Sequence, residues 1–197
     1  CSSDLDDGWT ARAFHASATV CGWLLIMGGR TANGLVNDGY YSQHLAPRIW
    51  NQMINFNLGA REGASAVVVP ETATVYVAGG YTNDGYKNDL WKYSGCDTCP
   101  CLPFMMSWTQ ITETASWTPR SHAHLFYIDN KLMLLAGVNG FGAASNVWQT
   151  EESDFSNWNQ ICANTGWNVT HTSASYDGYT IGIYGGEING VVKTDVW

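Results

Sequence analysis

Two histidines stand at matching positions ahead of glycines that end two apolar stretches. The sequence separation from His122 to Gly137 equals the separation from His171 to Gly186. Imidazole nitrogens bind zinc, copper, iron and nickel, so two adjacent rings would begin a metal site. An equivalent apolar stretch near the start of the chain ends at Gly29. The residue at the same separation before Gly29 is Phe14, which cannot bind a metal. The pattern therefore favours packing residues, keeps His122 and His171 as metal candidates, and predicts no cofactor.

The cysteines form either disulfides or a zinc site. They are Cys1, Cys21, Cys96, Cys99, Cys101 and Cys162, with three crowded into 96–101 and three isolated. Zinc sites usually present two spaced pairs, so disulfides are favoured, and all six are expected to be bonded, some to cysteines outside this sequence. Asn168 begins an Asn-Val-Thr sequon for glycosylation. Both features predict a secreted, extracellular protein.

Charge and motifs exclude several functions. The 197 residues carry 17 acidic and 9 basic side chains, a net charge of −8, which argues against binding to nucleic acid or to anionic membranes. The apolar stretch 23–27 is too short to span a bilayer. No nucleophile elbow, phosphate-binding glycine loop or HExxH pair occurs. The expected partners are a protein, a glycan or copies of the chain itself.

An internal repeat organises these residues. Four β-rich runs end in two small residues, and an aromatic follows each run at one constant spacing, at Tyr40, Trp91, Trp148 and Trp197. Equal spacings of this kind indicate a repeat architecture. We expect one domain, 1–197, with units at about 9–58, 59–116, 117–166 and 167–197, the last incomplete. Each complete unit is predicted as four short strands, here called A to D.

The units resemble kelch repeats, the four-stranded blades of one class of β-propeller. Paired glycines close strand B, the aromatic lies on strand C, and two further positions recur: a tryptophan on strand D (Trp50, Trp108, Trp158) and an arginine opening strand A (Arg12, Arg61, Arg120). Ala136 replaces a glycine in the third unit, and Thr170 stands near the arginine position in the fourth. The resemblance implies an all-β, kelch-type β-propeller with four recognisable blade units, part of a larger propeller.

The predicted strand directions sort the loops onto two faces. The A–B and C–D turns share one face, which holds both Cys21 and the 96–101 cluster. A bond from Cys21 to one member of the cluster is therefore predicted, with the other two closing a small loop, and the sequence does not choose among them. The same insert carries Phe104, Met105 and Met106, which form either an apolar contact surface or a small core over the disulfides.

The fourth unit ends at Trp197, on strand C, without a strand D. An unpaired edge recruits another strand, so Trp197 is also expected at an interface. The leading hypothesis is a non-catalytic extracellular propeller that binds a protein or glycan, or packs in a surface or fibrous assembly. The alternative is an enzyme with a metal on the propeller axis, as in copper-radical oxidases, whose Tyr–Cys cross-link and tyrosine ligands have no matching motif here.

Overall fold

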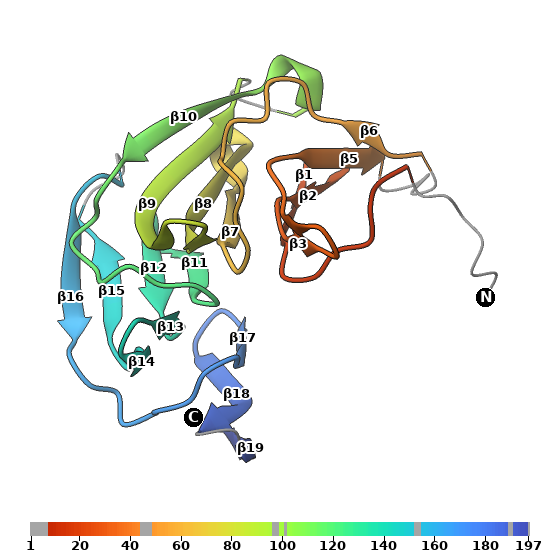
Figure 1. Ribbon diagram of the computed structural model, residues 1–197. Coiled ribbons are helices and arrows are strands. Elements are labelled where there is room, and N and C mark those ends of the chain that lie inside the picture. Colours follow the sequence, from red (N-terminus) through yellow and green to blue (C-terminus); the bar gives the residue numbers. More distant parts are fainter. Residues whose placement is uncertain are drawn as a thin grey trace.

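Antiparallel strands form four small sheets, which are arranged as four blades of a β-propeller (Figure 1). This computed structural model describes residues 8–43, 49–95, 99–100, 102–151, 155–188 and 191–196. The predictions for Cys1, Cys96, Cys101 and Trp197 lie outside the described residues. The all-β, four-blade prediction is confirmed.

Each blade takes its strands in chain order from the inside of the arc to the outside. Blade 1 contains β1 (Ala16–Val20), β2 (Trp23–Met27), β5 (Gly39–Gln43) and β6 (Asn51–Gln52). Blade 2 contains β7 (Ser65–Val69), β8 (Thr74–Thr82), β9 (Gly85–Ser94) and β10 (Ser107–Thr112). Blade 3 contains β11 (His124–Ile128), β12 (Lys131–Leu135), β15 (Val147–Thr150) and β16 (Trp158–Cys162). Blade 4 contains β17 (Ser173–Tyr176), β18 (Ile181–Ile188) and β19 (Val191–Val196).

The B–C connections differ between blades. Blades 1 and 3 add separate short hairpins there, β3 (Arg30–Thr31) with β4 (Gly34–Leu35) and β13 (Val138–Asn139) with β14 (Gly142–Ala143). In blade 2 the long strands β8 and β9 continue into one hairpin instead. Two single-turn 3-10 helices, η1 (Pro70–Thr72) and η2 (Pro103–Met105), lie in the A–B and C–D connections of blade 2.

Blade 2 shows why the strands are apolar on both sides. Successive side chains of a strand point to opposite faces of its sheet. Val75 and Val77 belong to the buried cluster shared with blade 1, whereas Tyr76 and Ala78 belong to the cluster shared with blade 3. A third, smaller cluster around Ile183 joins blade 3 to blade 4. The core therefore consists of layers between successive blades, as the repeat predicted.

The repeated arginine ties the strands of its own blade together. In blade 2, Arg61 pairs through both terminal nitrogens with Asp89 at 2.8 Å and donates to the carbonyl oxygen of Gly79. Arg12 contacts Asp38 and Gly28 in the same way in blade 1. In blade 3, Arg120 donates to the carbonyl oxygen of Ala136 and to the side-chain oxygen of Asn146. These contacts fix the end of strand B against strand C.

Candidate functional site

One residue at the entrance of strand A takes a left-handed conformation in every blade. The four residues are Phe14, Gly63, His122 and His171, with φ between 53° and 61°. The Gly63 N–H donates to the Phe14 carbonyl at 2.8 Å, and the His122 N–H donates to the Gly63 carbonyl at 2.7 Å. These bonds join blades 1, 2 and 3 around the axis. The equal sequence separations had identified Phe14, His122 and His171 as equivalent positions, but not Gly63.

The side chains of this row gather around His122. Its ring centroid lies 5.1 Å from that of Phe14 and 4.9 Å from that of His171. A Cβ on Gly63 would come within 2.7 Å of the His122 ring, so the glycine provides the space for the imidazole. Burial, and then the nearby His171, lower the pKa of His122 below its usual value. A neutral imidazole packed among rings is the result.

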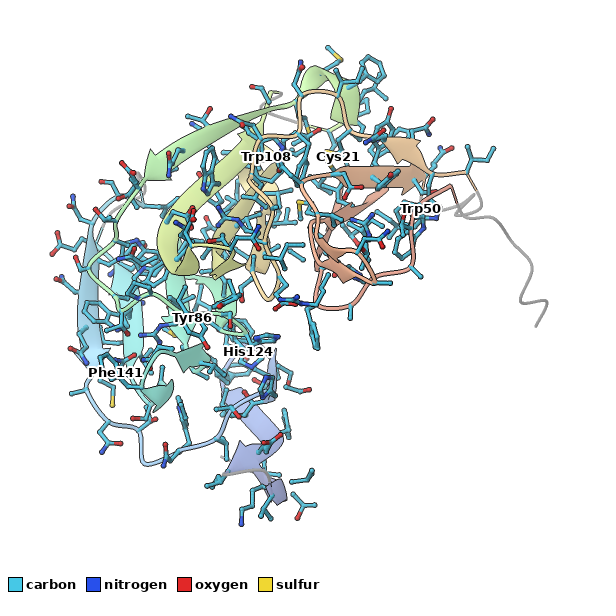
Figure 2. All side chains as sticks on the ribbon, viewed as in Figure 1. Cys21, Trp50, Tyr86, Trp108, His124 and Phe141 are labelled. Atoms are coloured by element: carbon cyan, nitrogen blue, oxygen red, sulfur yellow. A yellow bond between two sulfur atoms is a disulfide. The ribbon has the colours of Figure 1, made fainter. Side chains whose placement is uncertain are left out.

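The two candidate metal ligands are thus adjacent, but no third ligand accompanies them within the described residues. No group of three or more His, Cys, Asp or Glu side chains there has the geometry to hold a metal ion. His124, labelled in Figure 2 on the inner side of the arc, is engaged with the Thr172 hydroxyl of blade 4 at 2.9 Å. Glu62 is held at 2.7 Å by two donors of Arg30. The metal role of His122 and His171 stays a prediction.

Two hollows open on the face that carries the B–C and D–A connections. The axial hollow, of about 250 Å³, is lined by Glu62, Tyr81, Tyr86, Ser121, His122, Val138 and His171. The larger one, here called the blade-2 hollow, has a volume of about 610 Å³ and is lined by residues 57–61, 82–84, 86–89, 91, 110, 113 and 114. Tyr86, labelled in Figure 2, lines both.

Tyr86 is positioned by the continuous hairpin of blade 2. It pairs across β8 and β9 with Tyr81, and the two rings meet edge to face at 4.9 Å. The Asn83-Asp84 turn joins them. This hairpin was not among the features predicted from the sequence. Two tyrosines flanking a short turn were the available signal, because such a turn projects cross-strand aromatic side chains beyond the sheet.

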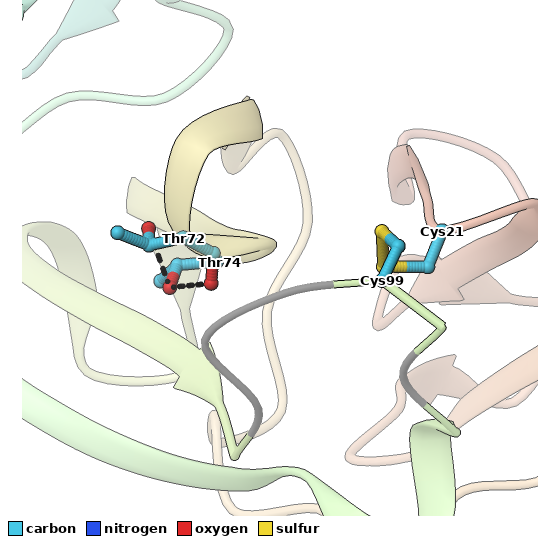
Figure 3. The surroundings of a disulfide bond; sticks show 4 residues. All are labelled: Cys21, Thr72, Thr74 and Cys99. Atoms are coloured by element: carbon cyan, nitrogen blue, oxygen red, sulfur yellow. Dashed lines mark hydrogen bonds between the residues drawn. A yellow bond between two sulfur atoms is a disulfide. The ribbon is translucent and has the colours of Figure 1, made fainter.

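The opposite face carries a disulfide between Cys21 and Cys99, which are 78 residues apart (Figure 3). It joins the A–B turn of blade 1 to the C–D insert of blade 2. The predicted bond from Cys21 to the 96–101 cluster is therefore confirmed, with Cys99 as the partner. Cys162 is half-buried and is a free thiol in the structure. The proposed bond of Cys162 to a cysteine outside the sequence stays a prediction.

The insert of blade 2 divides its apolar side chains between surface and core. Phe104 is 57% exposed and Met105 58%, whereas Met106 is only 6% exposed and belongs to the core between blades 1 and 2. The Tyr93 hydroxyl donates to the Pro103 carbonyl at 2.5 Å and anchors the turn. Of the three predicted contact residues, Met106 is thus unavailable at the surface, because the chain turns inward after η2.

Asn168 lies on the linker from blade 3 to blade 4 and is exposed, while the next residue, Val169, is fully buried. The asparagine side chain of the sequon is therefore accessible to a glycosyltransferase. The described residues include no helix with the length and apolar character needed to cross a membrane.

Comparison with known proteins supports the fold. No protein-family model matches the chain, and no curated protein is similar to it in sequence. The solved structure of YjhT is similar to it with a TM-score of 0.70 and 16% identity, over 89% of this chain and 59% of that one. The chain thus spans about three fifths of that protein. At this identity the likeness shows a β-propeller, and the kelch family stays a prediction.

Proposed function

We propose that the chain is a non-catalytic extracellular interaction module that binds a protein or glycan partner through the face carrying the B–C and D–A connections. The observation that carries this proposal is the pair of hollows on that face, which share the edge of Tyr86. Concave surfaces with a few polar groups and aromatic side chains are the usual binding sites of proteins. Loops at one end of a rigid scaffold are where binding residues concentrate.

Two acidic groups of this face, Asp89 and Glu62, are engaged by arginines, which supports binding over catalysis. A carboxylate that acts as a base or nucleophile must be able to receive a proton or attack a substrate. Asp89 instead accepts two bonds from Arg61 and one from the Trp91 indole, and Glu62 accepts two from Arg30. Both carboxylates are held as structural acceptors. The Cys21–Cys99 disulfide and the exposed Asn168 sequon support an extracellular location.

Two matched tyrosine variants test this proposal. Tyr86→Ala alters the proposed face, and Tyr179→Ala removes a 97% exposed tyrosine from the A–B turn of blade 4 on the opposite face. Binding of neutral and acidic oligosaccharides, and of the chain to itself, is measured by biolayer interferometry and sedimentation. We expect Tyr86→Ala to weaken the interaction by about tenfold or more, since buried aromatic contacts dominate binding energy. Tyr179→Ala should leave it unchanged.

A partner that binds Tyr86→Ala and the unaltered chain equally would contradict the proposed face. Turnover of a bound oligosaccharide or alcohol, together with a stoichiometric metal in elemental analysis of the purified protein, would contradict the non-catalytic role.

A further inference from the structure

The blade-2 hollow is walled by three segments that are separated in sequence. These are the linker 57–61 from blade 1, the hairpin 82–91 and the end of blade 2 at 110–114. A volume of about 610 Å³ lies within the range of small-molecule sites. The hollow is therefore large enough for two or three sugar rings, and its chemistry indicates which ones.

Trp91 lines the hollow and has a fixed orientation. Its indole N–H donates at 2.8 Å to Asp89, which is itself held by the buried Arg61. The indole also packs against the buried cluster between blades 1 and 2. The repeat equivalent in blade 3 differs: Asn146 stands in place of Asp89, and the Trp148 indole nitrogen is buried without a partner among the described residues. Blade 2 alone of these two holds its tryptophan as a rigid platform.

Unused hydrogen-bonding groups surround this platform. Asn57, Asn83, Gln110 and Glu113 line the hollow, are exposed, and make no side-chain hydrogen bond with any other described residue. Gln110 lies directly opposite Trp91 across the strand pair β9–β10. Amide side chains offer both donors and acceptors, the combination that a sugar hydroxyl requires. An apolar ring flanked by amides matches a pyranose, which has one apolar face and a rim of hydroxyls.

Charge decides between neutral and anionic sugars. The lining includes three acidic side chains, Asp84, Asp89 and Glu113, against two basic ones, Arg61 and Lys87. The charge of Arg61 is neutralised by its ion pair with Asp89. The Lys87 ammonium nitrogen lies 4.0 Å from a carboxylate oxygen of Asp84. The chain as a whole carries −8. A carboxylate, sulfate or phosphate on the ligand would therefore be repelled.

We propose that the blade-2 hollow binds a neutral oligosaccharide, with one pyranose ring stacked on Trp91 and its hydroxyls bonded to Asn57 and Gln110. This inference rests on the proposed function and names the ligand class of the same face.

The experiment is titration calorimetry of the full chain with neutral tetrasaccharides of glucose, galactose, mannose and N-acetylglucosamine, and with sulfated counterparts. The test variant is Asn57→Ala/Gln110→Ala. Its matched control is Gln52→Ala/Gln160→Ala, which removes the exposed glutamines that lie opposite Tyr40 and Trp148 in blades 1 and 3. All four side chains are exposed, so folding should be retained, and thermal unfolding confirms it.

We expect at least one neutral tetrasaccharide to bind, about tenfold or more weakly to the test variant and with unchanged affinity to the control, because one hydrogen bond contributes about a factor of 2 to 13. Binding by none of the neutral tetrasaccharides, binding insensitive to the test variant, or preference for sulfated ligands would overturn the inference. If the chain binds an acidic glycan or itself and Tyr86→Ala abolishes that binding, the proposed function is supported, and only the inference of a neutral oligosaccharide is wrong. If no interaction depends on Tyr86 or on the Asn57/Gln110 pair, both fail.

Discussion

The joint between blades 2 and 3 and the joint between blades 3 and 4 use the same repeat positions with different residues. At the first joint the Gly80 N–H donates to the Arg120 carbonyl at 2.8 Å, and a Cβ on Gly79 would lie 2.7 Å from the same oxygen. At the second, Ala136 carries the Cβ that Gly79 lacks, and the buried Val169 stands at the arginine position, two residues before His171. No backbone hydrogen bond joins blade 3 to blade 4 within the described part of the chain.

Imidazole contacts replace the missing ones at the second joint. His122 packs against His171, and His124 bonds to Thr172. The buried cluster there is also the smallest of the three. The glycine of the repeat thus allows the close approach of backbones at the first joint, whereas the joint with Ala136 is held by a small apolar cluster and by titratable side chains.

Removing the acid of the buried ion pair should have the largest effect. Asp89→Ala leaves Arg61 buried without its carboxylate, so we expect a loss of about 3–5 kcal/mol in the free energy of unfolding, measured in urea. Asn146→Ala, the blade 3 equivalent, should cost about 1 kcal/mol, since only a hydrogen bond to Arg120 is lost. Burial without a carboxylate already lowers the pKa of Arg120 to about 10. Equal losses would show that the two blades do not differ here.

Removing the disulfide between blades 1 and 2 should lower the free energy of unfolding by about 2–4 kcal/mol, because the bond closes a long loop and so restricts the unfolded chain. The variant is Cys21→Ser/Cys99→Ser. The backbone bond from Gly29 to the Arg61 carbonyl remains, so unfolding should stay a single transition. An unchanged midpoint in urea would mean that the bond contributes no stability.

Adding a Cβ at Gly79, the position that Ala136 occupies in blade 3, should show how close the backbones of blades 2 and 3 must be. Gly79→Ala places that atom against the Arg120 carbonyl at a positive φ of 61°, and we expect a loss of about 2–3 kcal/mol. The control is Gly85→Ala, which also has a positive φ but no atom within 4 Å of the new Cβ. Similar losses in thermal unfolding would assign the effect to backbone strain alone.

Acid should weaken the joint between blades 3 and 4 through a smaller effect. Burial lowers the folded-state pKa of His122 and of His124 below the ordinary value of 6.5, so the unfolded chain binds protons first. The two neutral imidazoles therefore contribute to the free energy of unfolding above pH 6.5, and this contribution is lost as the pH falls through their lowered folded-state pKa values. His171 facing His122 opposes its protonation, and Glu62, paired with Arg30, favours it.

The matched variant for this pH effect is His122→Phe, which copies Phe14 of blade 1. Its stability, followed in urea from pH 7.5 to 5, should fall less steeply than that of the unaltered chain. An identical slope would exclude His122 as a source of the pH dependence.

The repeat predicted the blades because its signals, glycine pairs and strand aromatics, are local in sequence. An offset in blade 2 hid Gly63, since the count that leads from Gly137 back to His122 leads from Gly80 back to Ser65. The turn containing η1 makes this part of blade 2 longer. A residue separation measured across a hairpin changes with the length of its turn, whereas the backbone conformation at the entrance of strand A is the same in every blade.

The candidate site was less predictable because it depends on three-dimensional approach. The predicted strand directions placed Cys21 on the same face as the 96–101 cluster, which limited its partner to that cluster. The path of the insert then selects Cys99 as the partner and turns Met106 inward. The blade-2 hollow arises from three separate segments, and the ion pair that fixes Trp91 joins Arg61, which precedes strand A, to Asp89 on strand C. The arginine and the acid recur along the sequence, but their pairing, the path of the insert and the walls of the hollow become apparent only in three dimensions.

We expect blades 1 to 3 to form one rigid frame for the proposed binding face, with blade 4 attached by a weaker, titratable joint. Hydrogen exchange measured by mass spectrometry at pH 7 and pH 5, corrected for intrinsic rates, compares the local stability of the two parts. We predict lower protection around Ile183 in β18 than around Val77 in β8, with a difference that widens at pH 5. Equal protection of the two strands at both pH values would show that blade 4 is held as firmly as blade 2.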